Sequence, residues 1–344
     1  MKSDKYSFAS DNCAGVHQNI MEALNKTNAG YVHSYGDDGY TREAVETIKN
    51  QFDGKASVYF VYNGTGANVT GITQLVNSYH TVFCSQAGHI HVDECGSLEH
   101  YAGCKVVAIP SVDGKISPEQ IAPLLVGVGD EHRSQPGLIS ITQPTECGVV
   151  YTQNEIRRLS DFAHQHNMHL HMDGARISNA AAAMGLKLKE LTSFCGVDLL
   201  SLGATKNGLM FGEAVVFLNQ DLDKYYPYIR KQGMQLHSKM RFIAAQFQEM
   251  FGTDLWIENA AHANNMAQRL LRGIEKYSQI TVTQKVQCNA IFAILPKEMI
   301  EDLQKTFHFY VWDESTCEVR LMTSYQTTEQ EVDEFIEAVD SMLR

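Results

Sequence analysis

The sequence predicts an α/β fold built on a mainly parallel seven-stranded β-sheet, followed by a smaller C-terminal α+β domain. Seven short apolar runs, each bounded by turn residues, alternate with helical or loop segments across residues 58–218. Within this region, residues 169–208 have the pattern strand, helix, strand, which favours parallel strands whose carboxyl ends lie at the same edge. Such alternation is typical of a sheet covered by helices on both faces.

The elements of the large domain follow in order along the chain. Residues 1–30 are polar and have little apolar periodicity, so we expect an irregular arm there. A turn-rich loop over residues 31–40 leads into a helix over residues 41–52. The expected strands are residues 58–62, 81–84, 105–109, 138–142, 168–172, 197–202 and 214–218. Helices are expected between them at residues 67–77, 117–126, 154–166 and 178–191.

The small domain begins after a predicted long helix over residues 233–250, which the turn FGTD ends. We place the boundary there, so that residues 1–250 form the large domain and residues 251–344 form the small one. Its expected helices and strands interleave: helices at 260–277, 297–307 and 328–343, strands at 280–286, 291–295 and 319–323. The last helix begins with a capping box between Thr328 and Glu331.

Composition limits the possible functions. The 344 residues are 44% hydrophobic and 20% charged, which is enough to bury a sizeable core. The formal net charge of −12 argues against a nucleic-acid partner. No apolar run approaches the ~20 residues needed to span a bilayer, and the start lacks a signal-peptide core. We expect a cytoplasmic protein without membrane association that acts on a small molecule.

The predicted chemistry depends on Asp173 and Lys206. Each follows an apolar strand, and the two strands are neighbours in the predicted sheet, so both side chains are expected at one crevice. A deprotonated lysine can form a Schiff base with a carbonyl, and an acid across the crevice can pair with a protonated ring nitrogen. This combination indicates pyridoxal 5'-phosphate as the cofactor.

The motif NGTGAN at residues 63–68 follows a strand and begins a helix. Its two glycines let backbone N–H groups approach an anion closely, and the positive end of the helix favours a phosphate. The motif lacks the third glycine of a dinucleotide-binding fingerprint and the lysine of a P-loop. Alone it is more often a tight turn, but Lys206 and Asp173 favour a phosphate site here.

Two histidine-rich runs support an alternative. Both alternate polar and apolar residues, so on strands the polar members of each run would share one face. They are His89, His91 and Asp93 in the first run and His169, His171 and Asp173 in the second. Imidazole and carboxylate groups can bind zinc and activate water, which makes a metallohydrolase a second hypothesis. It gives Lys206 and the glycine turn no role, and we assign no metal site.

Two arginines are candidates to bind a substrate carboxylate, because the guanidinium fork suits bidentate binding. Arg176 leaves the same turn as Asp173. Arg320, in a strand of the small domain, contributes only if that domain covers the crevice. The ordinary alternative for either residue is a solvated or salt-bridged side chain.

Six short motifs occur in one order: SD at 10–11, YGDDGY at 35–40, NGTGAN at 63–68, QAGHIHVDECG at 86–96, HMDGAR at 171–176 and SLGATKNG at 201–208. Together they resemble the threonine aldolase and β-eliminating lyase group of pyridoxal-phosphate enzymes. That group has the aspartate-aminotransferase fold, also called fold type I. The resemblance covers essentially the whole chain, and six motifs in register are far more specific than any one of them.

The resemblance implies a role for each matching residue. Lys206 would form the Schiff base with the cofactor, and Asp173 would keep the pyridine nitrogen protonated. His89 would stack on the cofactor ring and is a candidate for activating the substrate hydroxyl, whereas the role of Glu94 stays open. Further implied cofactor contacts are Gly64, Thr65, Arg176 and Thr205. The implied substrate contacts are Ser10, Tyr35, Arg176 and Arg320.

The implied reaction is the aldol cleavage of a β-hydroxy-α-amino acid, threonine or allo-threonine, to glycine and acetaldehyde. The alternative is a β-eliminating lyase acting on another β-substituted amino acid, which would release ammonia and a keto acid. A binding protein on a degenerate enzyme fold would also keep the pattern, but the intact lysine, acid, histidine and phosphate turn argue against it.

The sequence departs from the family pattern at Ala9 and Asn12 and at residues 143–146, where QPTE replaces Glu-Asn-Thr-His. The last change lies where a residue could contact the cofactor ring, so it bears on substrate preference. Relatives of this fold commonly build the active site at a subunit interface. This implies a homo-oligomer, a dimer or tetramer, in which the loop over residues 31–40, Arg230 and Lys231 reach a neighbouring subunit's cofactor.

Overall fold

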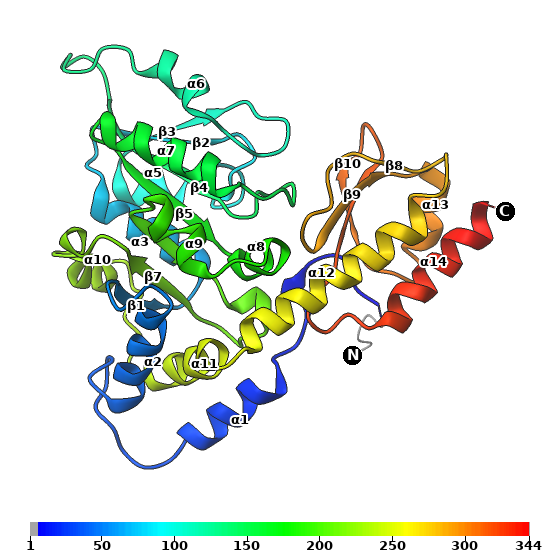
Figure 1. Cartoon of the computed structure of the whole chain (residues 1–344), viewed down its shortest axis with the longest axis horizontal. Helices are drawn as coiled ribbons and strands as arrows, with labels where there is room; N and C mark the ends of the chain where they lie inside the picture. The colour runs from blue at the N-terminus through cyan, green and yellow to red at the C-terminus, as the bar shows by residue number, and fades with distance from the viewer. Residues whose placement is uncertain (1–5, 344) are drawn as a thin grey trace.

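The structure, a computed structural model, describes residues 6–343. Its large sheet has the strand order β1-β7-β6-β5-β4-β2-β3 (Figure 1). The strands are β1 Ser57–Val61, β2 His80–Ser85, β3 Lys105–Ile109, β4 Gln135–Thr142, β5 His169–Gly174, β6 Leu199–Leu202 and β7 Glu213–Phe217. All neighbours are parallel except the two pairs that contain β7. The predicted seven-stranded, mainly parallel sheet is confirmed.

Helices cover both faces of this sheet because its central strands are apolar on both sides. In β7, Val215 and Phe217 belong to one buried cluster and Ala214 and Val216 to another, as the two-residue period of a strand requires. The first cluster includes residues of the helices α3 (Gly64–Leu75), α5 (Ser97–Ala102) and α10 (Tyr226–Gln232). The second includes residues of α2 (Gly39–Asn50), α7 (Gln153–Gln165), α8 (Ile177–Met184) and α11 (Arg241–Gly252).

The helices are α1 Gln18–Thr27, α2 Gly39–Asn50, α3 Gly64–Leu75, α4 His89–Val92, α5 Ser97–Ala102, α6 Pro118–Ile121, α7 Gln153–Gln165, α8 Ile177–Met184, α9 Leu188–Leu191, α10 Tyr226–Gln232, α11 Arg241–Gly252, α12 Leu255–Ile274, α13 Lys297–Leu303 and α14 Glu329–Leu343. Local chemistry explains several of their ends. The Asp38 side chain caps α2 by accepting from the Thr41 N–H. Thr152 and Glu155 form a capping box at the start of α7. No helix within residues 6–343 is both long and apolar enough to cross a membrane.

A second, antiparallel sheet has the strand order β10-β11-β9-β8. Its strands are β8 Thr281–Val282, β9 Ala290–Ile294, β10 Tyr310–Asp313 and β11 Glu318–Met322. Figure 1 shows α12 running from the large sheet to this small sheet, with α14 beside it. Phe8 joins the core of this part, since its N–H donates to His308 O and its carbonyl accepts from Met322 N–H, both at 2.7 Å. The domain boundary at residue 250 stays a prediction.

Several predicted elements differ from the structure. Residues 1–30 are not wholly irregular, because α1 forms there and buries Ile20. The helix predicted over residues 178–191 is split at Gly185, whose φ of 65° ends α8. The helix predicted over residues 233–250 begins only at Arg241, after turns that include Met234 at φ 61°. The sequence analysis also missed α5, α10 and β10.

The core of the small sheet predicts a large effect of one substitution. Phe335 is fully buried in α14, and its ring contacts those of Phe8 and Phe307 at centroid distances of 5.2 and 5.0 Å. Phe335→Ala is expected to lower the free energy of unfolding by about 3–5 kcal/mol, because it leaves a cavity among aromatic side chains. Urea unfolding measures this.

The matched control is Phe194→Ala, which removes a ring that is 51% exposed. We expect it to change the free energy of unfolding by about 0.5 kcal/mol or less. Equal effects of the two substitutions would contradict the packing described here.

Candidate active site at the carboxyl ends of β5 and β6

The site is organised by the loops that follow two parallel strands. Asp173 lies at the end of β5, and Lys206 lies in a 3-10 turn just after β6. The Gly203 N–H donates to Gly174 O at 3.1 Å. A Cβ on Gly203 would lie 2.5 Å from the Cα of Ala175, so only glycine fits between the loops. The structure therefore brings the predicted acid and lysine to one edge of the sheet.

The surroundings of Lys206 favour its neutral form. The Arg176 guanidinium, and after it burial, lower the pKa of the Lys206 ammonium, while Asp11, Asp173 and Glu213 act to raise it. The net direction is downward. A larger fraction of the amine is then deprotonated at neutral pH, which is the form that attacks a carbonyl.

Asp173 is held by a buried hydrogen-bond network. The Asn68 Nδ2 atom donates to Asp173 Oδ2 at 2.8 Å and to Glu94 Oε1 at 2.9 Å. The Ala175 N–H donates to the other Asp173 oxygen at 2.9 Å. Because one amide joins both acids, the two carboxylates keep a fixed separation.

Glu94 also orients His89. Its Oε1 atom lies 2.8 Å from His89 Nδ1, and this hydrogen bond is the largest cause of the raised pKa of His89. The contact uses Nδ1 and leaves Nε2 as the ring nitrogen that can meet a ligand. The role of Glu94, open from the sequence, is thus to fix the imidazole.

Arg176 is bound by an acid that the sequence analysis did not assign. Its Nε and Nη2 atoms donate to Asp11 at 2.6 and 2.8 Å. Burial acts to raise the pKa of Asp11, but the charge and hydrogen bonds of Arg176 outweigh it and keep that pKa below its usual value. Asp11 therefore occupies one edge of the Arg176 guanidinium, which was predicted to bind a substrate carboxylate. Nη1 is the nitrogen that is not part of this contact.

Arg320 and Ser10 lie at the same place. Arg320 donates to Ala9 O at 3.0 Å, and its guanidinium lies 5.0 Å from the Trp312 ring centroid. Burial, then the charge of Arg176, lower the pKa of Arg320. Ser10 caps the short turn that contains Asp11, with its Oγ accepting from the Asn12 N–H at 3.2 Å. The small sheet thus places Arg320 near Arg176, and its contact with a substrate carboxylate stays a prediction.

The glycine-rich turn begins α3 as expected. The Asn63 side chain caps the helix by accepting from the Gly66 N–H at 2.7 Å. Nothing lies within 4 Å of the place where a Cβ on Gly64 would be, so the backbone there is open to a ligand. Gly66 is covered instead, since a Cβ would lie 2.4 Å from Gln235 Cδ. Thr205, also predicted to contact the cofactor, donates its hydroxyl to Gly212 O at 3.2 Å.

Tyr35, a predicted substrate contact, lies at the surface of the chain. It is 51% exposed, with a φ of 61°, and Lys231 Nζ lies 5.2 Å from its ring centroid. Together with Gln235 it lines a surface hollow near the first turn of α3. Among the described residues, Tyr35 thus lies near the amino end of α3.

The two histidine runs do not form paired strand faces. His89 and His91 lie on α4, so the predicted first strand face is wrong. His171 is fully buried between Ser140 Oγ and Ser201 Oγ, at 2.9 and 3.0 Å, and burial lowers its pKa to about 4. Both its ring nitrogens are engaged by hydroxyls, which removes His171 from any metal site.

One group among the described residues has metal-ligand geometry: His89, Glu94 and Asp173 bring one ligand atom each within 4.8 Å of one another. Asn68 already donates to both carboxylates, and a hydrogen bond joins His89 Nδ1 to Glu94 Oε1. We therefore describe the group as a hydrogen-bond network.

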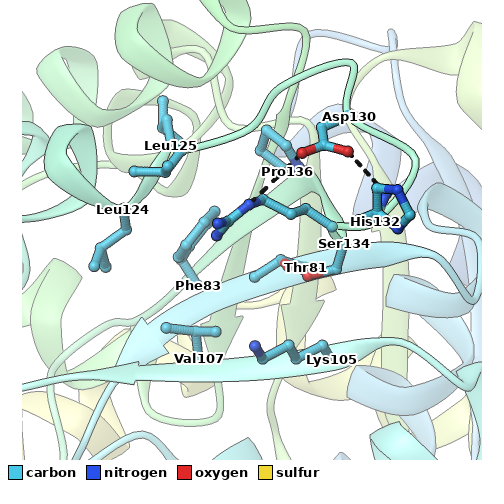
Figure 2. Close-up of a pocket in the computed structure, with 12 residues that line it drawn as sticks. Thr81, Phe83, Lys105, Val107, Leu124, Leu125, Asp130, His132, Ser134 and Pro136 are labelled. Atoms are coloured by element: carbon cyan, nitrogen blue, oxygen red, sulfur yellow. Dashed lines mark hydrogen bonds and ion pairs between the residues drawn. The ribbon is translucent and has the colours of Figure 1, made fainter.

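A separate cavity of about 520 Å³ lies at the amino ends of β2, β3 and β4. Figure 2 shows Phe83 and Val107 on one side of it and Asp130 with His132 on another. Asp130 accepts from the His132 N–H at 3.0 Å and pairs with Arg133 at 3.9 Å. Because Lys206 and Asp173 follow the carboxyl ends of the strands, this cavity lies at the opposite edge of the sheet.

Three polar residues of the site had no role assigned from the sequence: Asn68, Glu146 and Glu213. Asn68 and Glu146 are bonded to the groups described above, and Glu213 accepts from the Ala204 N–H at 2.8 Å. Burial raises the pKa of Glu213 to about 7. In the sequence, the available signal was an amide or acid residue within an apolar segment. Such a residue does not reveal which distant group it will bond.

Comparison with known proteins defines the class first. A threonine aldolase from Leishmania major superposes with a TM-score of 0.93 at 31% identity, over 98% of this chain and 100% of that chain. A mutant aspartate aminotransferase from Thermus thermophilus superposes with a TM-score of 0.72 at 12% identity, over 98% and 96%. The chain has the aspartate-aminotransferase fold, fold type I, as predicted.

Sequence comparison then gives the family. A model of the beta-eliminating lyase family matches residues 7–297. A low specificity L-threonine aldolase from Pseudomonas sp. strain NCIMB 10558 is 37% identical over 336 residues, 97% of each chain. The chain belongs to the beta-eliminating lyase family and is an enzyme of the lyase class.

The Asn68 bridge predicts a loss of stability on its removal. Asn68→Ala is expected to lower the free energy of unfolding by about 1–3 kcal/mol, because two buried carboxylates each lose a donor. Asn68→Asp should destabilise more at neutral pH, since it adds a third acid, and part of that loss should be regained as the pH falls and an acid is protonated. Urea unfolding at two pH values measures both effects; a pH-independent loss in Asn68→Asp would argue against the network.

The electrostatics of Lys206 predict its reactivity. Arg176→Met should move the reaction of Lys206 to higher pH, because the largest cause of its lowered pKa is removed while Asp11 and Asp173 stay. The measurement is pulsed reductive methylation of the protein over a pH series, followed by mass spectrometry of the Lys206 peptide. Arg157→Met, at an exposed position, is the matched control and should leave the Lys206 profile unchanged.

Proposed function

We propose that this enzyme cleaves the Cα–Cβ bond of a β-hydroxy-α-amino acid, threonine or allo-threonine, to glycine and acetaldehyde, with pyridoxal phosphate held at Lys206. The observation that carries the proposal is a lysine of lowered pKa beside a buried, hydrogen-bonded acid at one sheet edge. The names of the Pseudomonas and Leishmania relatives support the same reaction.

The residues present fit the cofactor. Lys206 would bind its carbonyl carbon, and Asp173, kept in place by Asn68, would face its ring nitrogen. The open backbone at Gly64, which with Thr65 begins a 12-residue helix at its positive end, suits its phosphate. When bound, pyridoxal phosphate supplies the electron sink that bond cleavage at Cα requires.

The chain's own residues would position the substrate. Ser10, Arg320 and the Nη1 atom of Arg176, which is not part of the Asp11 contact, lie together where an amino-acid carboxylate could bind. Fixing that carboxylate sets which bond at Cα stands perpendicular to the cofactor ring, and this positioning selects the reaction.

His89 is our candidate for the proton of the substrate hydroxyl. Its Nδ1 is held by Glu94, which raises the pKa of the imidazole and lets Nε2 take up a proton and hold it. The proton would leave the β-oxygen as the C–C bond breaks and the aldehyde forms.

A β-eliminating lyase is the second candidate, favoured by the family model. It would use the same Lys206 and Asp173 but would release ammonia and a keto acid. We also propose a cytoplasmic location and a homo-oligomer, a dimer or tetramer, in which Tyr35, Arg230 and Lys231 complete a neighbouring subunit's site. The exposure of Tyr35 beside Lys231 supports the proposed homo-oligomer.

The test is a product assay with L-threonine and L-allo-threonine, combined with borohydride trapping. Wild type should form acetaldehyde and glycine in equal amounts, and borohydride should fix the cofactor to the peptide that contains Lys206. Lys206→Ala should lose more than about 10³-fold in kcat, since the group that carries the covalent chemistry is gone.

Arg158→Ala, at an exposed arginine on α7, is the control and should keep full activity. Ammonia and a keto acid in place of glycine would favour the β-eliminating alternative. Failure to bind pyridoxal phosphate would refute both.

A further inference from the structure

Glu146 is a half-buried residue with a buried carboxyl oxygen, and the reaction proposed above does not use it. It lies in the turn after β4, and one of its two carboxyl oxygens already accepts two hydrogen bonds. Its Oε1 atom accepts from Thr142 Oγ1 at 2.7 Å and from the His89 N–H at 2.8 Å. Its Oε2 atom is buried and has no hydrogen-bond partner among the described residues.

The position of Glu146 directs it toward the cofactor site. Thr142 pairs with Asp173 across β4 and β5, and His89 carries the imidazole held by Glu94. Glu146 is thus bonded to the two segments that flank the proposed cofactor ring. An unpaired buried oxygen is costly, which favours a partner supplied by the bound molecule.

The charges around Glu146 favour its neutral form. Burial, and after it the nearby Asp173 carboxylate, raise the pKa of Glu146, and the hydrogen bonds from Thr142 and His89 offset this only in part. Arg176 is the cation that interacts with it. Cys84, Cys147 and Tyr151 also interact with Glu146, and their raised pKa values keep them neutral. His89 is the exception, since its raised pKa favours the charged imidazole.

We propose that Glu146 carries its proton on Oε2 and donates it as a hydrogen bond to an anionic oxygen of the molecule bound at Lys206. Because Oε1 already accepts two hydrogen bonds, the proton belongs on the unpaired oxygen. The acceptor is either the ring oxygen of pyridoxal phosphate or the carboxylate of the amino acid. This inference rests on the proposed cofactor and names a further residue that binds it or the substrate.

The first experiment tests the proton without any ligand. Infrared spectroscopy of the cofactor-free protein at neutral pH should show the carbonyl band of a protonated carboxylic acid that is absent from Glu146→Gln. Glu213→Gln is the matched control, since it removes another buried acid near Lys206 and should leave that band in place. A spectrum in which Glu146→Gln loses nothing would overturn the proposal.

The second experiment tests the acceptor in the holoenzyme. A hydrogen bond donated to the negatively charged ring oxygen weakens the attraction between that oxygen and a protonated Lys206 nitrogen. It therefore lowers the pH at which this nitrogen loses its proton. Glu146→Ala should therefore raise the pH midpoint of the holoenzyme's visible absorption change by about one unit. Glu146→Gln retains an N–H donor and should shift this pH midpoint less than Glu146→Ala does.

The outcomes separate the two sources of the oxygen. A shifted midpoint in the absence of amino acid identifies the ring oxygen. An unchanged midpoint with about tenfold weaker glycine binding identifies the carboxylate. If neither quantity changes while borohydride still fixes the cofactor to Lys206, the Glu146 proposal is wrong and the proposed function stands. If wild type does not bind the cofactor, the proposed function fails first. Thermal unfolding of each variant confirms that it is folded.

Discussion

The contact between the loops after β5 and β6 is the constraint on which the rest of the site depends. The backbone of Gly203 lies so close to Ala175 that a side chain has no room, and Gly174 accepts its N–H. Parallel neighbours place their carboxyl ends at one edge, and this contact then fixes the separation of Asp173 from Lys206. Every other group of the site is arranged around that pair.

The site concentrates acids in a buried space, and hydrogen bonds decide their charges. Asp11 is compensated by Arg176, and Asp173 and Glu94 share the Asn68 amide. Glu146 and Glu213 lack a comparable cation contact, and burial raises the pKa of each. The pKa shifts thus favour the ionised form of Asp11, which has a cation beside it, and the protonated forms of Glu146 and Glu213, so one site can contain both hydrogen-bond acceptors and donors.

The small sheet contributes through its edges. Ser7 forms an isolated bridge with His308, and the Phe8 carbonyl accepts from the Met322 N–H of β11. The same chain segment then carries Ser10 and Asp11 toward Arg176. Arg320 reaches this segment from β11. The first and last parts of the sequence therefore meet at the place proposed for the substrate carboxylate, so that substrate binding and the packing of Phe8 into the small core are linked.

The sequence by itself determined the sheet, its strands and the pair formed by Lys206 and Asp173, because apolar runs and strand-to-helix alternation are local patterns. It also determined that a turn at Gly64 begins a helix, since the motif NGTGAN directly follows an apolar run. Only the tertiary structure decided that Asn68 joins Asp173 to Glu94, that Asp11 occupies Arg176, and that Glu146 lies against His89. These contacts join residues 26 to 165 positions apart, and a sequence pattern carries no information about which distant partner a buried polar group will meet. The same reason explains the misplaced His89, whose alternating pattern fits a strand although the residue lies on α4.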